Sequence, residues 1–310
     1  MVTSHHKSTR IPSNLQNGML INSGICGVFG ITINILILIV LCKRFKKSNV
    51  HADIKICTFV CFVDVIVSLG LIFRAIFVKY PYNILKLHPN WCKFDTVAVT
   101  MLINCSGYIL GVMSIERFFL VCWNIQLPAI IWFILIFLAI SVAEGSSIIS
   151  VANNLQTLTI SEVTCTVKSI ESGYICYTIS AIFFLLSFST IIFSYFSIMV
   201  VKTRQCLNQI NLNIPKEAVY AELRSTIFKS LIYIILYILV FSAKFYILCY
   251  TIITGKKRTL PMDVASIILL SYSPSVNALI LLCMNQNVRT DFIIFIKSMK
   301  SKILRAEQIY

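Results

Sequence analysis

The chain has 310 residues, of which 58% are hydrophobic and 13% are charged, and its mean hydropathy is +0.85. Soluble domains carry about 25% charged residues, so this composition excludes an ordinary soluble domain and indicates a protein that crosses a membrane several times. The formal net charge is +15, but the basic residues form short clusters between apolar runs. Membrane topology accounts for that pattern better than nucleic-acid binding, so no nucleic-acid partner is expected.

Seven apolar segments reach the length of about 20 residues that a helix needs to cross the hydrocarbon core. They cover residues 18–42, 54–78, 92–122, 129–151, 174–201, 226–253 and 261–284. Each must be helical, because lipid offers no partner for free backbone groups. We therefore expect an all-α membrane protein, a seven-transmembrane helix bundle over residues 18–284.

Basic residues predict the orientation of this bundle. Four of them follow the first span: Lys43, Arg44, Lys46 and Lys47. Lysine and arginine concentrate on the cytoplasmic side, which predicts a multi-pass plasma-membrane protein with its N-terminus outside. The extracellular tail, residues 1–17, is too short for a folded ligand-binding domain, so a ligand should enter the bundle itself.

The cytoplasmic region, residues 285–310, has its own pattern. Four apolar residues recur there at helical spacing among lysines: Phe292, Ile296, Met299 and Ile303. This indicates a short amphipathic helix from Val288 to Leu304 that lies on the inner leaflet and contacts membrane lipid. A frayed tail is the alternative.

The third span has polar residues at both ends. Cys92 and Arg117 are 25 residues apart, which corresponds to about 37 Å along a helix. That length exceeds the hydrocarbon thickness of about 30 Å, so the two residues should lie at opposite faces of the membrane. Between them, Gly107 and Gly111 form a G-x-x-x-G pattern that predicts close helix packing.

Polar residues recur in a characteristic order through the spans. They are Asn34 in the first, Asp64 in the second, Cys92, Ser106 and Glu116-Arg117-Phe118 in the third, Tyr195 in the fifth, and Asn277, Asn285 and Arg289 in and after the seventh. In this order and spacing, over roughly residues 20–300, the chain resembles the rhodopsin-like (class A) G-protein-coupled receptors.

The chain also departs from the family pattern. Ala278 and Leu281 replace the proline and tyrosine of the seventh span, and Pro274, one turn earlier, is expected to supply the kink. Phe241-Ser242-Ala243 stands in place of the sixth-span tryptophan-x-proline. Ser187 stands where a fifth-span proline is usual. These differences mark a divergent member.

The resemblance implies an output at the inner end of the third span. Arg117 would be held there by Glu116 and, across the bundle, by Glu222, until its release lets the sixth span move and a heterotrimeric G protein dock. The other residues of this predicted switch are Phe118, Tyr195 and Asn277. The alternative is an ordinary interfacial arginine whose side chain extends to water.

The acid near the middle of the membrane is Asp64, whose charge costs at least ~2.5 kcal/mol to insert. The oxygens expected around it belong to Asn34, Ser106, Ser273 and Asn277. The resemblance implies a sodium ion at Asp64, and hard cations do prefer oxygen ligands. A protonated or water-bridged aspartate is the alternative, and no other cofactor is expected.

The resemblance also implies a disulfide between Cys92 and Cys165, which would both face the oxidising exterior. Two free thiols are the alternative.

The ligand is less defined. Val99 stands where amine receptors carry an aspartate, which disfavours an amine ligand. The segment between Asp263 and Asn285 contains no lysine, so a retinal Schiff base at the usual place in the seventh span is excluded. The charged residues in the outer half are Arg74, Asp95, Glu144, Lys244 and Asp263. Four of them (Arg74, Asp95, Lys244 and Asp263) form, with Val99, the predicted pocket. An unknown, small extracellular ligand is expected to bind there. They could equally pair with one another.

Two other functions compete with a receptor. A seven-span transporter or channel is one, although transporters usually show repeats and broken helices in matched halves. A receptor-like scaffold that no longer couples is the other. The sequence contains no Walker loop, H-E-x-x-H or hydrolase elbow, so no enzymatic activity is expected.

Overall fold

The computed structural model describes residues 11–45, 51–168, 172–212 and 214–307. Five long helices are α1 (Ser13–Phe45), α2 (Ala52–Phe77), α6 (Ala129–Ala152), α7 (Ser172–Asn211) and α8 (Lys216–Thr254). The third span is a continuous run of α4 (Pro89–Asp95), the π-helical turn η1 (Thr96–Met101) and α5 (Leu102–Cys122). The remaining helices are the short α3 (Ile84–Leu87), the pair α9 (Leu260–Ser271) and α10 (Ser273–Met284), and α11 (Gln286–Glu307).

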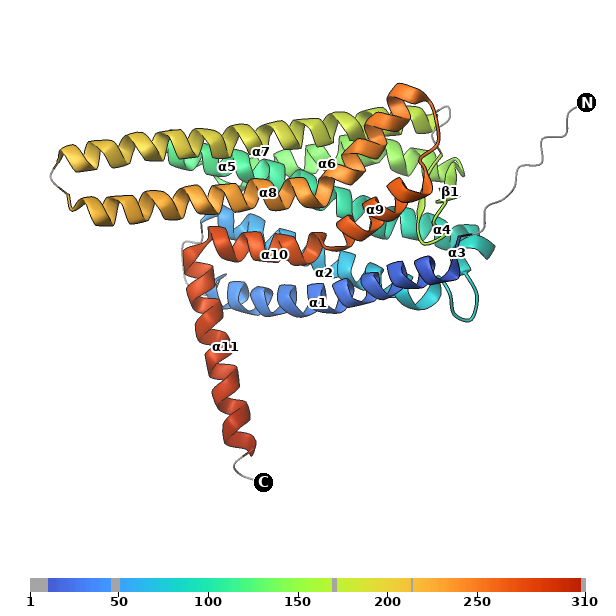
Figure 1. Ribbon diagram of the computed structural model, residues 1–310, viewed down its shortest axis with the longest axis horizontal. Coiled ribbons are helices and arrows are strands. Elements are labelled where there is room, and N and C mark those ends of the chain that lie inside the picture. The colour runs from blue at the N-terminus through green and yellow to red at the C-terminus, as the bar shows by residue number, and fades with distance from the viewer. Residues whose placement is uncertain (1–10, 46–50, 169–171, 213, 308–310) are drawn as a thin grey trace, which may run out of the picture.

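These helices form the predicted seven-helix bundle. Within the described residues, six spans meet the length and hydropathy of a membrane crossing, and α9 with α10 makes the seventh as a pair bent by 42°. Figure 1 shows the long helices side by side, with α7 and α8 projecting beyond the others at one end. Both helices run past their predicted limits of residues 201 and 226, because helical backbone continues beyond the apolar part of each segment.

The bend in the seventh span lies where the sequence predicts it. Pro274 is in the first turn of α10, directly after the break at Tyr272. Proline lacks a backbone N–H and its ring clashes with the preceding turn, so the helical hydrogen bonds cannot run through it. The proline shifted by one turn therefore still bends this helix.

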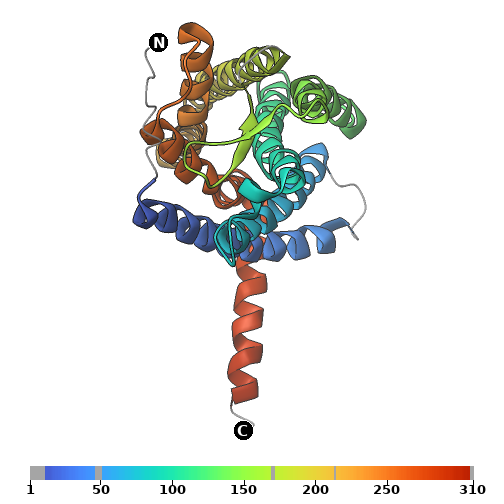
Figure 2. The same cartoon turned by 90° about the vertical axis from the view of Figure 1, so that its right-hand side faces the viewer.

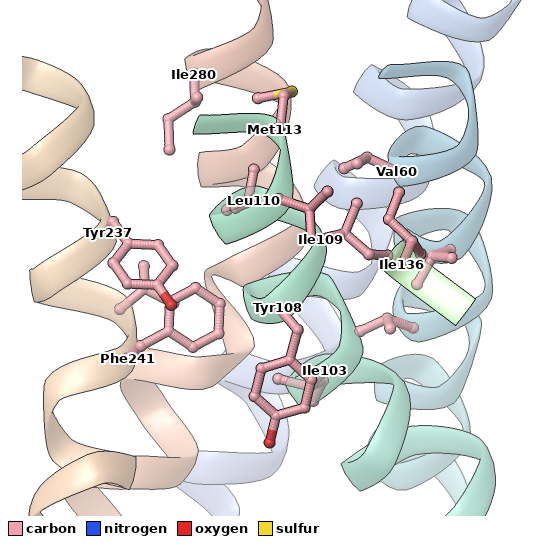
Figure 3. Close-up of a cluster of buried hydrophobic side chains, with 14 of the residues drawn as sticks. Val60, Ile103, Tyr108, Ile109, Leu110, Met113, Ile136, Tyr237, Phe241 and Ile280 are labelled. Atoms are coloured by element: carbon pink, nitrogen blue, oxygen red, sulfur yellow. The ribbon is translucent and has the colours of Figure 1, made fainter. Parts of the chain in front are cut away.

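The third span is the centre of the bundle. In its most apolar window 78% of the residues are buried, against 22% in α6. Figure 3 shows Ile109, Leu110 and Met113 of α5 surrounded by side chains from the neighbouring helices. A Cβ on Gly107 would lie 3.0 Å from the Phe241 ring, and one on Gly111 would lie 3.0 Å from Ser187 Oγ. The predicted close packing at these glycines is confirmed.

One end of the bundle carries a small hairpin and the other carries α11. Strands β1 (Gln156–Leu158) and β2 (Cys165–Val167) pair antiparallel, with Leu158 opposite Cys165. Figure 2 looks onto this end and shows the hairpin lying across the ring of helices. Helix α11 covers the predicted amphipathic segment and runs away from the side of the bundle (Figure 1).

The outer surface of the bundle is apolar. Large side chains such as Ile130, Phe137 and Phe193 are more than half exposed. Water would penalise so much exposed apolar area, whereas lipid accepts it. This surface, together with the spans, is that of a multi-pass membrane protein.

Candidate functional site

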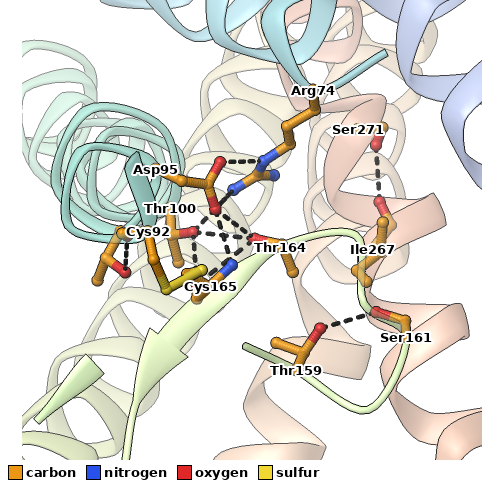
Figure 4. A network of polar contacts seen from close by, with 11 residues as sticks. Arg74, Cys92, Asp95, Thr100, Thr159, Ser161, Thr164, Cys165, Ile267 and Ser271 are labelled. Atoms are coloured by element: carbon orange, nitrogen blue, oxygen red, sulfur yellow. Dashed lines mark hydrogen bonds and ion pairs between the residues drawn. A yellow bond between two sulfur atoms is a disulfide. The ribbon is translucent and has the colours of Figure 1, made fainter. Parts of the chain in front are cut away.

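The hairpin is bonded to the third span. Cys92 and Cys165 form a disulfide with a Cα–Cα distance of 5.5 Å, which confirms the predicted pair. Both sulfur atoms are buried under the hairpin, beside the acid Asp95 (Figure 4). The disulfide therefore holds the hairpin over the outer end of α4.

A buried polar network continues from this disulfide. The Arg74 guanidinium of α2 donates to both oxygens of Asp95, at 2.6 and 3.1 Å. Asp95 Oδ2 also accepts from Thr164 Oγ1 at 3.0 Å and from the Cys165 backbone N–H at 2.7 Å (Figure 4). Asp263 is likewise paired, because it accepts from the Ser161 backbone N–H at 3.0 Å and from Arg258 at 3.0 Å. For these charges the alternative of mutual pairing holds.

Val99 was predicted to line the ligand pocket, but it is absent from the walls of the three cavities described at this end of the bundle. It is fully buried, and a Cβ on Gly70 of α2 would lie 2.5 Å from its Cγ2. The reason lies in η1, since a π-helical turn contains an extra residue and changes which side chains face the bundle interior. Asp95 and Asp263 are also absent from the cavity walls among the described residues. Of the five predicted pocket residues, Arg74 and Lys244 line a cavity.

Two adjoining cavities lie beneath the hairpin, and each has a volume of about 30 Å³. Thr100, Thr166 and Lys244 line both of them. The first also contacts Arg258 and the start of the seventh span. The second lies between α5, α6, α7 and α8 and is lined by Glu144. The sequence marks Glu144 as an outer-half charge but does not assign it to the pocket.

Asp64 lies in a buried oxygen-rich cluster. Its Oδ1 accepts from Ser106 Oγ at 3.0 Å, and both its oxygens lie 3.1 Å from Asn277 Nδ2. Asn277 Nδ2 is also 2.6 Å from Ser106 Oγ and 3.3 Å from Ser273 Oγ. One amide nitrogen with two hydrogens thus lies within reach of four oxygens, while Asn277 Oδ1 is buried without a partner.

Asn34 is not part of this cluster, contrary to prediction. Its Nδ2 donates to the Gly30 carbonyl at 2.9 Å and to the Pro274 carbonyl at 3.1 Å. Pro274 lies in the first turn of α10, so its carbonyl is close to the bend. Asn34 therefore joins α1 to the bend of the seventh span.

At the inner end, Arg117 is held by two acids. Its Nη2 lies 3.2 Å from Asp53 Oδ2 in the first turn of α2, and its Nε lies 3.9 Å from Glu116 Oε2. Asn285, between α10 and α11, donates to the same Asp53 oxygen at 3.1 Å. Asp53 consequently connects α2, α5 and the end of the seventh span.

The prediction that Glu222 pairs with Arg117 is wrong. Glu222 lies 3.4 Å from Lys202 and its side chain is 55% exposed. It belongs to the part of α8 that extends beyond the bundle beside α7, so it faces a basic residue of α7 and not the end of α5. The signal for Asp53 was present in the sequence, because it is the only acid among the basic residues between the first and second spans.

Two other predicted switch residues make apolar contacts. The ring of Phe118 lies 5.4 Å from the rings of Trp123 and Phe193, on the side of α5 that faces α7. Tyr195 is fully buried, and its ring lies 4.4 Å from that of Tyr233. Tyr233 in turn donates to the Leu110 carbonyl at 3.0 Å, so a chain of contacts joins α7, α8 and α5.

Comparison with known proteins identifies the fold. No family model and no curated protein matches the sequence. Among solved structures, the crystal structure of squid rhodopsin is similar with a TM-score of 0.66 and 14% identity, covering 98% of this chain and 91% of that one. An alignment over nearly both full lengths at such low identity shows a shared seven-helix architecture.

Proposed function

We propose that this chain, which has the seven-helix fold of the class A receptor squid rhodopsin, is a plasma-membrane receptor with its N-terminus outside. It senses an extracellular ligand within the bundle and activates a heterotrimeric G protein at the inner end of α5. The observation that carries this proposal is Arg117, a cation held by Asp53 and Glu116 at the cytoplasmic mouth of the central helix.

The Arg117 ion pairs can be displaced by a competing partner. Arg117 and Asp53 each keep a side-chain exposure of 14%, so the pair is shielded from water but can be reached from the inner groove. That groove is lined by Asp53, Glu116 and Asn285 among others. A partner helix that offers acceptors to Arg117 would compete with Asp53 for the guanidinium.

For α8 to move, hydrogen bonds between α8 and α5 must also break. Arg117 has no ion pair with α8 among the described residues, so its release alone does not free that helix. Tyr233 of α8 donates to Leu110, and Tyr237 donates to the Gly107 carbonyl at 3.4 Å. We infer that activation breaks both the Arg117–Asp53 pair and these tyrosine hydrogen bonds.

A sodium ion at Asp64 remains part of the proposal. The oxygens of Asp64, Ser106 and Ser273 form a donor set that suits a hard cation. Asn277 would have to turn its unpartnered Oδ1 toward them in place of the amide nitrogen. The positive charge would then offset the buried carboxylate and hold the second, third and seventh spans together.

The decisive experiment measures nucleotide exchange on purified heterotrimeric G protein by the receptor in nanodiscs. Arg117→Ala should lower agonist-independent exchange roughly ten-fold or more while surface expression is retained. Lys86→Ala is the control, because Lys86 also pairs with an acid, Glu162 at 2.8 Å, but at the opposite end of the bundle from the groove. Unchanged exchange in Arg117→Ala refutes the switch.

The same preparation separates the rival functions. A scaffold would bind ligand but support no exchange. A transporter or channel would move solute across proteoliposomes independently of G protein.

A further inference from the structure

Two buried charges in the outer half of the bundle have no counter-ion. Glu144 of α6 is 3% exposed, and neither of its carboxylate oxygens has a hydrogen-bond partner. Lys244 of α8 is 8% exposed. Across the described chain, neither side chain has an opposite charge within 4.0 Å. The two face the same cavity but do not touch each other.

The charges nearest to these two are paired. Nearby, Arg74 is paired with Asp95 and Arg258 with Asp263. A buried charge without a partner is costly in a medium of low dielectric constant, and an ionisable residue within a membrane bundle is therefore a functional candidate. The fold satisfies the surrounding charges and leaves these two to face a cavity.

The unpartnered atoms in the two cavities are complementary in kind. In the cavity with Glu144, Asn104 Oδ1 is a second buried acceptor without a donor. Asn104 and Ser147 lie beside the carboxylate but do not make a hydrogen bond to it with proper geometry. In the adjoining cavity, Arg258 Nη2 is a buried donor without an acceptor, and Lys244 lines both spaces.

We propose that these adjoining cavities together bind a small zwitterion of the amino-acid class, with its ammonium group at Glu144 and Asn104 and its carboxylate at Lys244 and Arg258. An ammonium group has three donors and no acceptor, and a carboxylate has acceptors only, so the ligand matches both sets. This inference rests on the proposed receptor function and names the ligand class of its bundle site.

A zwitterion fits better than a simple ion. A lone cation at Glu144 would leave Lys244 unpaired, and a lone anion at Lys244 would do the same to Glu144. Each cavity has a volume of about 30 Å³, which is room for one water-sized group, so the ligand must be small. The third span has Val99 in place of an acid that could bind an ammonium group, but Glu144 supplies such an acid from α6.

These two cavities share lining residues with a larger pocket. A wider pocket of about 440 Å³ opens between the hairpin and the end of α8. Its wall carries the cations Lys168, Lys257 and Arg258, and Arg258 also lines the inner cavity. A basic mouth of this kind raises the local concentration of molecules that present a carboxylate.

The test uses full-length receptor in nanodiscs and isothermal titration with four probes: glycine, L-alanine, β-alanine and γ-aminobutyrate. Each probe is compared with its amide, which lacks the carboxylate, and with its N-acetyl form, which lacks the ammonium. At least one zwitterion should bind roughly thirty-fold or more tightly than both of its derivatives. L-alanyl-L-alanine tests whether a peptide that reaches the outer pocket binds better. If no zwitterion binds better than its derivatives, the proposal is overturned.

Charge-deleted receptors give the sharper result. Glu144→Gln should no longer distinguish the zwitterion from its N-acetyl form, yet still discriminate against the amide. Lys244→Gln should show the reverse pattern. Glu162→Gln is the control, since Glu162 pairs with Lys86 in an exposed outer loop. Equal weakening of all probes by Glu144→Gln would indicate a structural role and overturn the assignment.

Agonist-independent nucleotide exchange, measured on the same samples, separates the two proposals. Zwitterion binding without any exchange contradicts G-protein coupling and leaves the site intact. Exchange without zwitterion binding overturns the site alone.

Discussion

Arg74 and Asp95 form a bidentate ion pair at 2.6 and 3.1 Å, with side chains that are 5% and 0% exposed. Through Thr164 and the Cys165 backbone, Asp95 also holds the hairpin that the disulfide binds to α4. One carboxylate therefore fixes α2, the third span and the hairpin together.

Removal of one member of the pair should destabilise the outer half of the bundle. Arg74→Met leaves Asp95 buried and unpaired, for which we expect a loss of about 3–5 kcal/mol. The double variant Arg74→Met with Asp95→Leu should recover part of that loss, because no lone charge remains. Thermal unfolding of the purified protein measures both, and a double variant less stable than the single one would contradict this account.

The Arg117–Asp53 ion pair can be broken without altering Arg117. Asp53→Asn keeps the shape of the side chain but removes the charge that holds the guanidinium, so agonist-independent nucleotide exchange should rise about five-fold or more. Glu222→Gln should leave exchange unchanged, because Glu222 pairs with Lys202 outside the bundle. If Glu222→Gln raised nucleotide exchange and Asp53→Asn did not, Glu222 would be the partner of Arg117 after all.

Tyr233 should restrain α8 through its hydroxyl group. Tyr233→Phe removes the hydrogen bond to Leu110 while the ring contact with Tyr195 remains, at a cost of about 0.5–1.5 kcal/mol. We expect a lower unfolding temperature and raised agonist-independent exchange. Tyr246→Phe, on an exposed face of α8, is the control and should change neither quantity.

Close packing between α2 and η1 can be tested at Gly70. A methyl group there would lie 2.5 Å from Val99, so Gly70→Ala should cost about 1–3 kcal/mol in the free energy of unfolding. Adding Val99→Ala should restore stability by making room. Gly145→Ala meets no atom within 4 Å and should be neutral or slightly stabilising.

The Asp64 cluster should respond to sodium. Replacing choline chloride with sodium chloride at equal ionic strength should raise the unfolding temperature of the protein, and Asp64→Asn should abolish that response. Asn34→Ala should retain it, because Asn34 bonds to Pro274 and not to Asp64. A sodium response that survives Asp64→Asn would rule out the ion at this site.

Much of the architecture could be predicted because it depends on local pattern. Apolar runs identify the spans wherever they occur, and Pro274 bends its helix through its own covalent structure. The Cys92–Cys165 pair followed from the family resemblance and a shared compartment. Side-chain partners were harder. The π-helical turn η1 rotates Val99 toward α2, and nothing in the sequence marks that turn.

What the sequence by itself determined is which residues enter the membrane and where the seventh span bends. Only the tertiary structure decided how the charges pair. Arg117 meets Asp53, whereas Glu144 and Lys244 are left facing a cavity. The physical reason is range: transfer into lipid is summed along one segment, but an ion pair depends on a few ångströms of separation set by the rotation and offset of two helices distant in the chain.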